Sequence, residues 1–268
     1  MAIVNLKNET LSRRVSWFFS RFPLPQHRGA RFLFELSLLV PAYFAYHLVR
    51  GAVDGRVDDA FVNGARLIQI EQALGIFWEL SLQALILESQ LLIAFFNGVY
   101  IWGHIPVIIG LAIWLFLFRP HVFARYRNAF LISGAIGLIV FVLMPVAPPR
   151  FMDAWGFVDT VTERSEAHRY LQPPAFVNQY AAMLSLHFGW NLIVGIAVYR
   201  HSSHIVGKII GVALPVFMFA SIVLTANHFI IDGLAGGSLA LVGLFAALML
   251  HQLSKRRVNN ERLGVAES

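Results

Sequence analysis

The chain has 268 residues, of which 57% are hydrophobic and 13% charged, and its mean hydropathy is +0.65, which excludes an ordinary soluble domain and indicates a polytopic membrane protein. The sequence contains no cysteine, so a disulfide framework and a thiolate metal site are both excluded. The net charge of +6 comes from short basic runs beside apolar segments rather than from one basic face, so no nucleic-acid partner is expected.

The chain opens with a basic segment, residues 1–31, which has no small-residue cleavage site after an apolar core, so no signal peptide is expected. Six apolar runs follow that can cross about 30 Å of hydrocarbon. These predicted spans are residues 32–49, 97–118, 128–146, 186–199, 207–225 and 229–251. The fourth run is short unless it begins near Tyr180. The expected fold is all-α, with one membrane domain over residues 32–252 and a tail at 253–268.

Residues 57–95 differ in kind from these runs. Their apolar positions are interrupted by charged residues, namely Asp58, Asp59, Arg66, Glu71 and Glu79. This pattern is typical of an amphipathic helix that lies at the membrane surface. Residues 81–96 either continue that helix or form a seventh, partial span.

Basic residues set the expected orientation. Fifteen of the 21 Lys and Arg residues lie in segments 1–31, 119–127, 200–208 and 255–262. The positive-inside rule places these segments, and hence both termini, in the cytoplasm. The loop at 147–184 is then extracytoplasmic. Short tails and loops favour a bacterial plasma membrane as the location.

Three polar motifs fall at the extracytoplasmic ends of the predicted spans. They are PVAPPR at 145–150, SLH at 185–187 and NHFIID at 227–232. An ionisable group at membrane depth costs several kcal/mol unless it is paired or lies in a water-filled cavity. Their convergence at one level therefore predicts a functional site.

His228 and Asp232 are four residues apart, so they share one face of a helix and the carboxylate can orient the imidazole. The other ring nitrogen is then available as a nucleophile, a base or a metal ligand. His187 offers a second proton-transfer group, and the planar fork of Arg150 suits phosphate oxygens. Together these residues favour phosphoryl transfer at an extracytoplasmic active site.

Three other interpretations stay open at this point. A single histidine in a membrane often serves only as a hydrogen-bonding group between helices. A zinc site of His187, His228 and Asp232 is chemically allowed, although the neighbouring Arg150 would repel a dication. A transporter or binding protein could use the same charges to hold an anion.

Two longer runs carry a resemblance to a known family. NQYAAMLSLHFGW (178–190) and TANHFIIDGLAGG (225–237) resemble two motifs of the type 2 phosphatidic acid phosphatase superfamily. With PVAPPRF (145–151) the chain looks more like the branch related to inositol phosphorylceramide synthase. The likeness covers the chain from about Asn97 onward.

This resemblance implies a metal-independent enzyme that needs no cofactor. His187 would protonate the leaving group, His228 would attack phosphorus to give a phosphohistidine, and Asp232 would orient His228. The implied substrate is a lipid with a phosphate-containing headgroup, and the acceptor is water or a lipid alcohol. The loop at 147–184 is long enough to cover the site and limit water, which favours headgroup transfer over hydrolysis.

The sequence also departs from the superfamily pattern. The Lys-x6-Arg-Pro motif is replaced by PPR, Ser221 and Ile222 stand where a Ser-Arg pair is usual, and Leu184 stands where the branch has proline. The phosphate must therefore be held by other groups. The predicted substrate-binding residues are Arg150, Ser185, Asn227, His104, Tyr100 and Tyr180, and the loop run ERSEAHR (163–169) is a further candidate.

Overall fold

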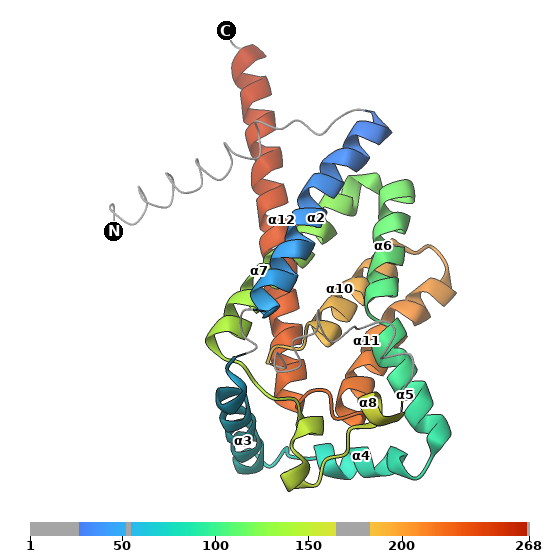
Figure 1. The fold of residues 1–268 in the computed structure, drawn as a ribbon. Helices are drawn as coiled ribbons and strands as arrows, with labels where there is room; N and C mark the ends of the chain where they lie inside the picture. The colour runs from blue at the N-terminus through green and yellow to red at the C-terminus, as the bar shows by residue number, and fades with distance from the viewer. Residues whose placement is uncertain (1–26, 52–54, 165–182, 267–268) are drawn as a thin grey trace.

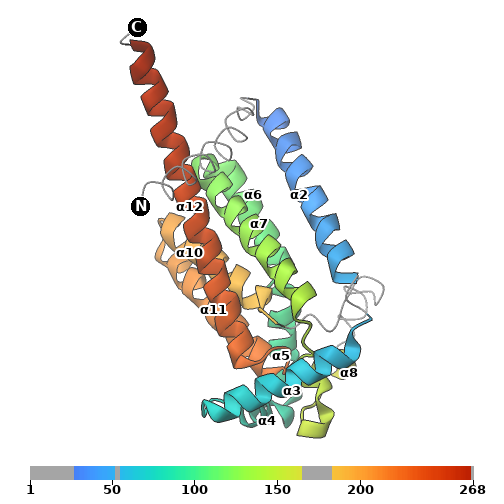
Figure 2. The same cartoon turned by 90° about the vertical axis from the view of Figure 1, so that its left-hand side faces the viewer.

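The computed structural model describes residues 27–51, 55–164 and 183–266, and over these residues the chain forms helices and no strands. The all-α prediction is confirmed for this part of the chain. Figures 1 and 2 show a helix bundle with two further helices, α3 (Val57–Ala73) and α4 (Glu79–Leu87), lying across one end. The candidate site residues gather at that end.

The bundle helices follow the apolar runs, because a helix satisfies its backbone N–H and C=O groups internally where there is no water. They are α2 (Arg28–Gly51), α5 (Gln90–Trp102), α6 (Ile105–Phe118), α7 (Pro120–Leu143), α10 (Leu186–His201), α11 (Ile205–Leu224) and α12 (Ile230–Ala266). Leu115, Ile193 and Ala247 belong to the apolar core between α6, α7, α10 and α12. An ion pair of 2.6 Å between Glu35 and Arg127 ties α2 to α7.

Three of these helices are long and apolar enough to cross a membrane, namely Pro120–Leu143, Ile205–Leu224 and Ile230–Arg256, and the bent pair α5–α6 makes a fourth if it counts as one span. α2 and α10 occupy two further predicted spans but do not meet the same criteria. α10 has 16 residues and is about 24 Å long, which is shorter than the hydrocarbon layer. The described residues thus support three or four spans, and six spans stay a prediction.

The predicted span 97–118 is not one straight helix. α5 and α6 meet at an angle of 45°, with Gly103 and His104 between them. Pro106 lies in the first turn of α6, where its missing N–H costs nothing, so the sequence favours a new helix start at this point. His104, at this break, is buried.

The segment at 81–96 is neither a simple continuation of one helix nor a separate span. α4 ends at Leu87, and α5 begins at Gln90 with Ser89 as its cap, whose side-chain oxygen accepts a hydrogen bond from the Leu92 N–H at 3.3 Å. Residues 90–96 therefore belong to the bent pair.

The charged residues of α3 and α4 do not all face solvent. Asp58 and Asp59 are exposed, whereas Glu71 and Glu79 are fully buried. Leu74, in the turn between the two helices, is 62% exposed. The sequence pattern would place Glu71 and Glu79 on the exposed face and Leu74 on the buried face, which is the reverse of what is observed.

α10 and α12 approach closely where the site forms. A Cβ atom on Gly236 would lie only 2.2 Å from the Ser185 carbonyl oxygen, so any larger residue would push the helices apart. The Ser185 N–H donates to the Asp232 carbonyl at 3.1 Å. The first turn of α10 is thereby fixed against the first turn of α12.

Candidate active site

Three imidazole rings and one phenol ring lie against one another at this end of the bundle. The His187 ring stacks on Tyr100 with 4.4 Å between ring centroids, and it lies 4.1 Å from the His104 ring and 5.8 Å from the His228 ring. Tyr100 comes from α5, His104 from the break before α6, His187 from the first turn of α10, and His228 from the turn before α12. The two histidines predicted to be catalytic therefore share one site.

Asp232 stands behind His228 as the four-residue spacing predicts. Its Oδ2 lies 3.7 Å from His228 Nδ1, within ion-pair reach but longer than a good hydrogen bond. The carboxyl is fully buried, and its Oδ2 also accepts a hydrogen bond from the Phe229 N–H at 3.3 Å. Asp232 thus faces Nδ1 of His228 while it also caps its own helix.

Arg150 lies in a one-turn 3-10 helix, η1 (Pro149–Phe151), and is buried. Its backbone N–H donates to the Ala226 carbonyl at 2.8 Å, two residues before His228. Its Nη1 lies 4.0 Å from Asp159 Oδ1, and neither Nε nor Nη1 has a hydrogen-bond partner among the described residues. A buried guanidinium with unused donors is suited to a phosphate group, which would supply the missing acceptors.

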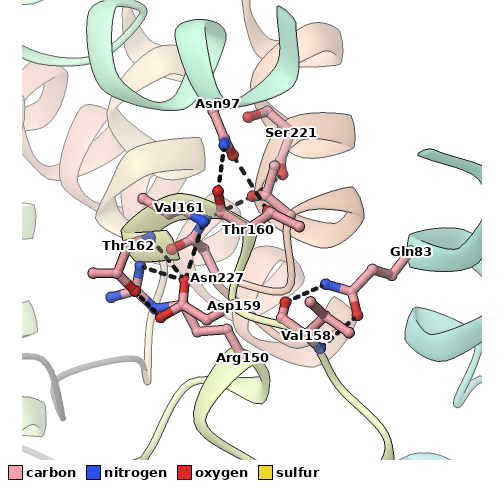
Figure 3. A network of polar contacts seen from close by, with 11 residues as sticks. Gln83, Asn97, Arg150, Val158, Asp159, Thr160, Val161, Thr162, Ser221 and Asn227 are labelled. Atoms are coloured by element: carbon pink, nitrogen blue, oxygen red, sulfur yellow. Dashed lines mark hydrogen bonds and ion pairs between the residues drawn. The ribbon is translucent and has the colours of Figure 1, made fainter. Parts of the chain in front are cut away.

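Asp159 is held in place by the helix that follows it, α8 (Thr160–Arg164). Its Oδ1 accepts hydrogen bonds from the Val161 and Thr162 N–H groups, both at 3.0 Å (Figure 3). These two hydrogen bonds already neutralise part of the negative charge of Asp159. The Asp159 carboxylate therefore neutralises Arg150 only in part, and the guanidinium can still bind an anionic ligand.

Two amide side chains bind the residues around the start of α8 to neighbouring helices. Gln83 exchanges two hydrogen bonds with the backbone of Val158, at 2.8 and 3.1 Å, and Asn97 donates to the Thr160 carbonyl at 2.7 Å (Figure 3). Asn97 and Thr160 are both buried. The stretch between η1 and α8 is thus anchored to α4 and α5 rather than free over the site.

Comparison with known proteins agrees with this geometry. A family model described as the PAP2 superfamily matches residues 65–246, which is more than half of the chain and contains all three motifs. The chain belongs to the PAP2 superfamily. Membership supports an enzyme of the phosphatase or phosphotransferase type and points to a phosphorylated lipid as substrate. No curated protein and no solved structure matches the chain.

One departure from the PAP2 pattern has a direct structural counterpart. Leu184 has a backbone φ of +62°, in the left-handed region. Proline fixes φ near −65° and cannot adopt this conformation. The turn that leads into Ser185 and His187 therefore differs in kind from one that proline would form.

Other residues predicted to bind the substrate have hydrogen bonds within the protein. Ser185 is fully buried and caps α10, because its Oγ accepts from the Phe188 N–H at 3.4 Å. Asn227 donates from Nδ2 to Thr225 Oγ1 at 2.6 Å within the turn before α12. Tyr180 and most of the run ERSEAHR lie outside the described residues.

Two site residues were not predicted. Glu79 Oε1 accepts the Ile230 N–H at 2.8 Å, and Glu71 Oε1 accepts the Ile231 N–H at 2.9 Å. Both carboxyls are fully buried, and they cap the helix that carries Asp232. Through these hydrogen bonds, α3 and α4 are joined to the backbone directly after His228.

Burial and the neighbouring Glu79 carboxyl raise the pKa of Glu71 to about 9, although the hydrogen bond from Ile231 opposes this shift. The second carboxyl oxygen of each residue, Oε2, has no hydrogen-bond partner among the described residues. A proton held by Glu71 and donated to Glu79 would satisfy both atoms. Both carboxyl groups lie at the first turn of α12, whose backbone N–H groups they accept.

The described residues contain no group of three or more His, Asp or Glu side chains placed to hold a metal ion. The arrangement of His187, His228 and Asp232 thus offers no support for the zinc alternative.

Proposed function

We propose that this PAP2 protein transfers the phosphorylated headgroup of a membrane lipid through a phosphohistidine intermediate. The observation that carries the proposal is the meeting of His187 and His228, with ring centroids 5.8 Å apart, beside a fully buried Asp232. Two imidazoles supply the nucleophile and the proton donor that phosphoryl transfer needs. Arg150 supplies unused donors for the phosphate oxygens.

In the first step, His228 is the nucleophile and His187 is the proton donor. Asp232 faces Nδ1 of His228, so Nε2 is the nitrogen that attacks phosphorus. The N–P bond forms as the bond from phosphorus to the leaving oxygen breaks, and the electron pair leaves with that oxygen. Protonated His187 donates its proton to the leaving oxygen, which departs as a neutral alcohol. Asp232 stabilises the positive charge on His228.

The second step reverses these roles. An acceptor hydroxyl attacks phosphorus while His187, now neutral, takes its proton. The N–P bond breaks, and its electron pair returns to His228. A lipid alcohol as acceptor gives a transferase, and water gives a phosphatase. Transfer is favoured because the loop at 147–184 is long, and its stretch at 149–164 is fastened by Gln83 and Asn97, which supports exclusion of water.

Hydrolysis of a lipid phosphate or a prenyl (pyro)phosphate is the alternative activity, and transport of an anion or lipid is the second. Product analysis separates all three. Purified protein with EDTA should convert phosphatidylinositol or a prenyl phosphate, and an added lipid alcohol should receive the phosphorylated headgroup. Release of only inorganic phosphate or free phosphorylated headgroup would favour hydrolysis, and no turnover would favour transport.

The proposal places the site on the extracytoplasmic face, which cysteine labelling can test. Ala154 lies in a one-turn 3-10 helix, η2 (Asp153–Trp155), and Ser203 lies between α10 and α11, at the opposite end of the bundle. Both residues are exposed, and the chain has no cysteine of its own. In intact cells, an impermeant maleimide should label Ala154→Cys and should label Ser203→Cys only after permeabilisation. The reverse pattern would place the site in the cytoplasm.

A further inference from the structure

A groove of about 620 Å³ runs between α5 and α11 on the outside of the bundle. Its lining includes Phe95, Gly98 and Trp102 from α5 and Ile210 and Met218 from α11, and nearly all of its surface is apolar. From Ile210 to Met218 the groove extends about 12 Å along the helix axis. Its volume is in the range of ligand-binding pockets, and Trp102 is 53% exposed at its edge.

The groove borders the candidate active site in two places. Gly103 lines it directly before His104, whose ring lies against His187. Asn191, the polar residue of the lining, donates from Nδ2 to the His187 carbonyl at 3.0 Å. A molecule in the groove therefore contacts residues that adjoin His104 and His187 directly.

We propose that this groove holds the hydrocarbon tail of the phosphorylated lipid substrate. The inference rests on the proposed function and adds a binding site for the tail. Bilayer hydrocarbon is as apolar as the groove, so burial of a tail there gains little affinity. The groove instead fixes the lateral position and depth of the lipid, so that its phosphate arrives beside His228. A second copy of the chain is a less suitable occupant, because two lining residues, Gly103 and Asn191, adjoin His104 and His187 of the candidate site.

Gly98 gives a way to fill the groove without disturbing the fold. A Cβ atom on Gly98 would meet nothing within 4 Å, so a leucine side chain has room to occupy the groove. Gly110 on α6 is a matched control, because it is also a helical glycine with nothing within 4 Å and it does not line the groove. Leucine also has a higher helix propensity than glycine at both positions.

The test compares a long-chain lipid phosphate with a short-chain, water-soluble phosphate ester. Gly98→Leu should lower the ratio of long-chain to short-chain kcat/KM by about tenfold or more, because a tail displaced by about 1 Å misplaces the phosphate. Gly110→Leu should leave the ratio unchanged. An unchanged ratio in Gly98→Leu, or an equal fall in Gly110→Leu, would overturn the proposal.

A binding measurement separates failure of the groove from failure of the proposed function. A long-chain lipid phosphate with a photoactivatable group in its tail should crosslink to α5 and α11 in the wild type and in Gly110→Leu, but not in Gly98→Leu. Crosslinking without turnover would reject the activity and keep the groove. Equal crosslinking by a phosphate-free lipid would show ordinary contact with bilayer lipid, and crosslinking between two copies of the chain would show a protein interface; either result would overturn the proposal.

Discussion

Replacement of His228 with alanine is expected to abolish turnover of every phosphorylated substrate. The variant lacks the nitrogen that forms the N–P bond, and Asp232 is left without the imidazole whose Nδ1 it faces. Thermal stability should stay near that of the wild type, because His228 is not part of the apolar clusters at this end of the bundle. His204→Ala, at an exposed position far from the site, is the control.

Trapping of the intermediate refines this result. With a substrate whose leaving group needs no proton, acid-quenched His187→Ala should still contain covalently bound phosphate, whereas His228→Ala should contain none. Turnover within about tenfold of the wild type in His228→Ala would contradict the nucleophile assignment. Equal loss of phosphoenzyme in both variants would remove the proton-donor role from His187 and leave it a binding role only.

Replacement of Glu79 with leucine is expected to lower turnover by about 100-fold. The change leaves the buried Ile230 N–H without an acceptor, which costs about 1 to 3 kcal/mol, and loosens the turn between His228 and Asp232. Glu79→Gln keeps an acceptor and should stay active. Glu88→Leu, at an exposed position directly after α4, is the control. Full activity in Glu79→Leu would show that α4 does not position the site.

The pH dependence of thermal stability tests whether Glu71 is protonated in the folded protein. Because the pKa of Glu71 rises from 4.5 to about 9 on folding, the folded state binds a proton that the unfolded state has lost between these values. The stability from Glu71 is therefore complete below about pH 4.5 and is lost as the pH rises toward 9. Glu71→Gln mimics the protonated form, so its melting temperature should vary less over this range. An identical pH profile would contradict the shared proton.

Local spacing is enough to predict that His228 and Asp232 lie close together. His228 and Asp232 lie within one helical turn, so their contact depends on no distant part of the chain. The break before His104 also has a local signal in Gly103 and Pro106. The apolar run at 97–118 nevertheless predicts one continuous helix across this break. The site motifs could thus be found from the sequence, although the path of the chain between them could not.

The roles of Glu71 and Glu79 had no such signal. A charged residue in an apolar pattern is normally placed on the polar face of a surface helix. Here the carboxylates accept from backbone N–H groups, which every residue except proline has, so no residue type marks their partners. Their hydrogen bonds span 160 and 151 positions in the chain, far beyond the reach of periodicity.

This separation has a consequence for how the protein is made. At about 5 to 20 residues per second, a ribosome needs on the order of 10 seconds to pass from Glu79 to Ile230. Until then Glu71 and Glu79 have no α12 to cap, and a solvated Glu71 is ionised at neutral pH. When α12 docks, Glu71 must take up a proton because its pKa is then about 9. Docking of α12 is therefore coupled to proton uptake by Glu71. In a nascent chain that stops before α12, Glu71 and Glu79 have no helix to cap.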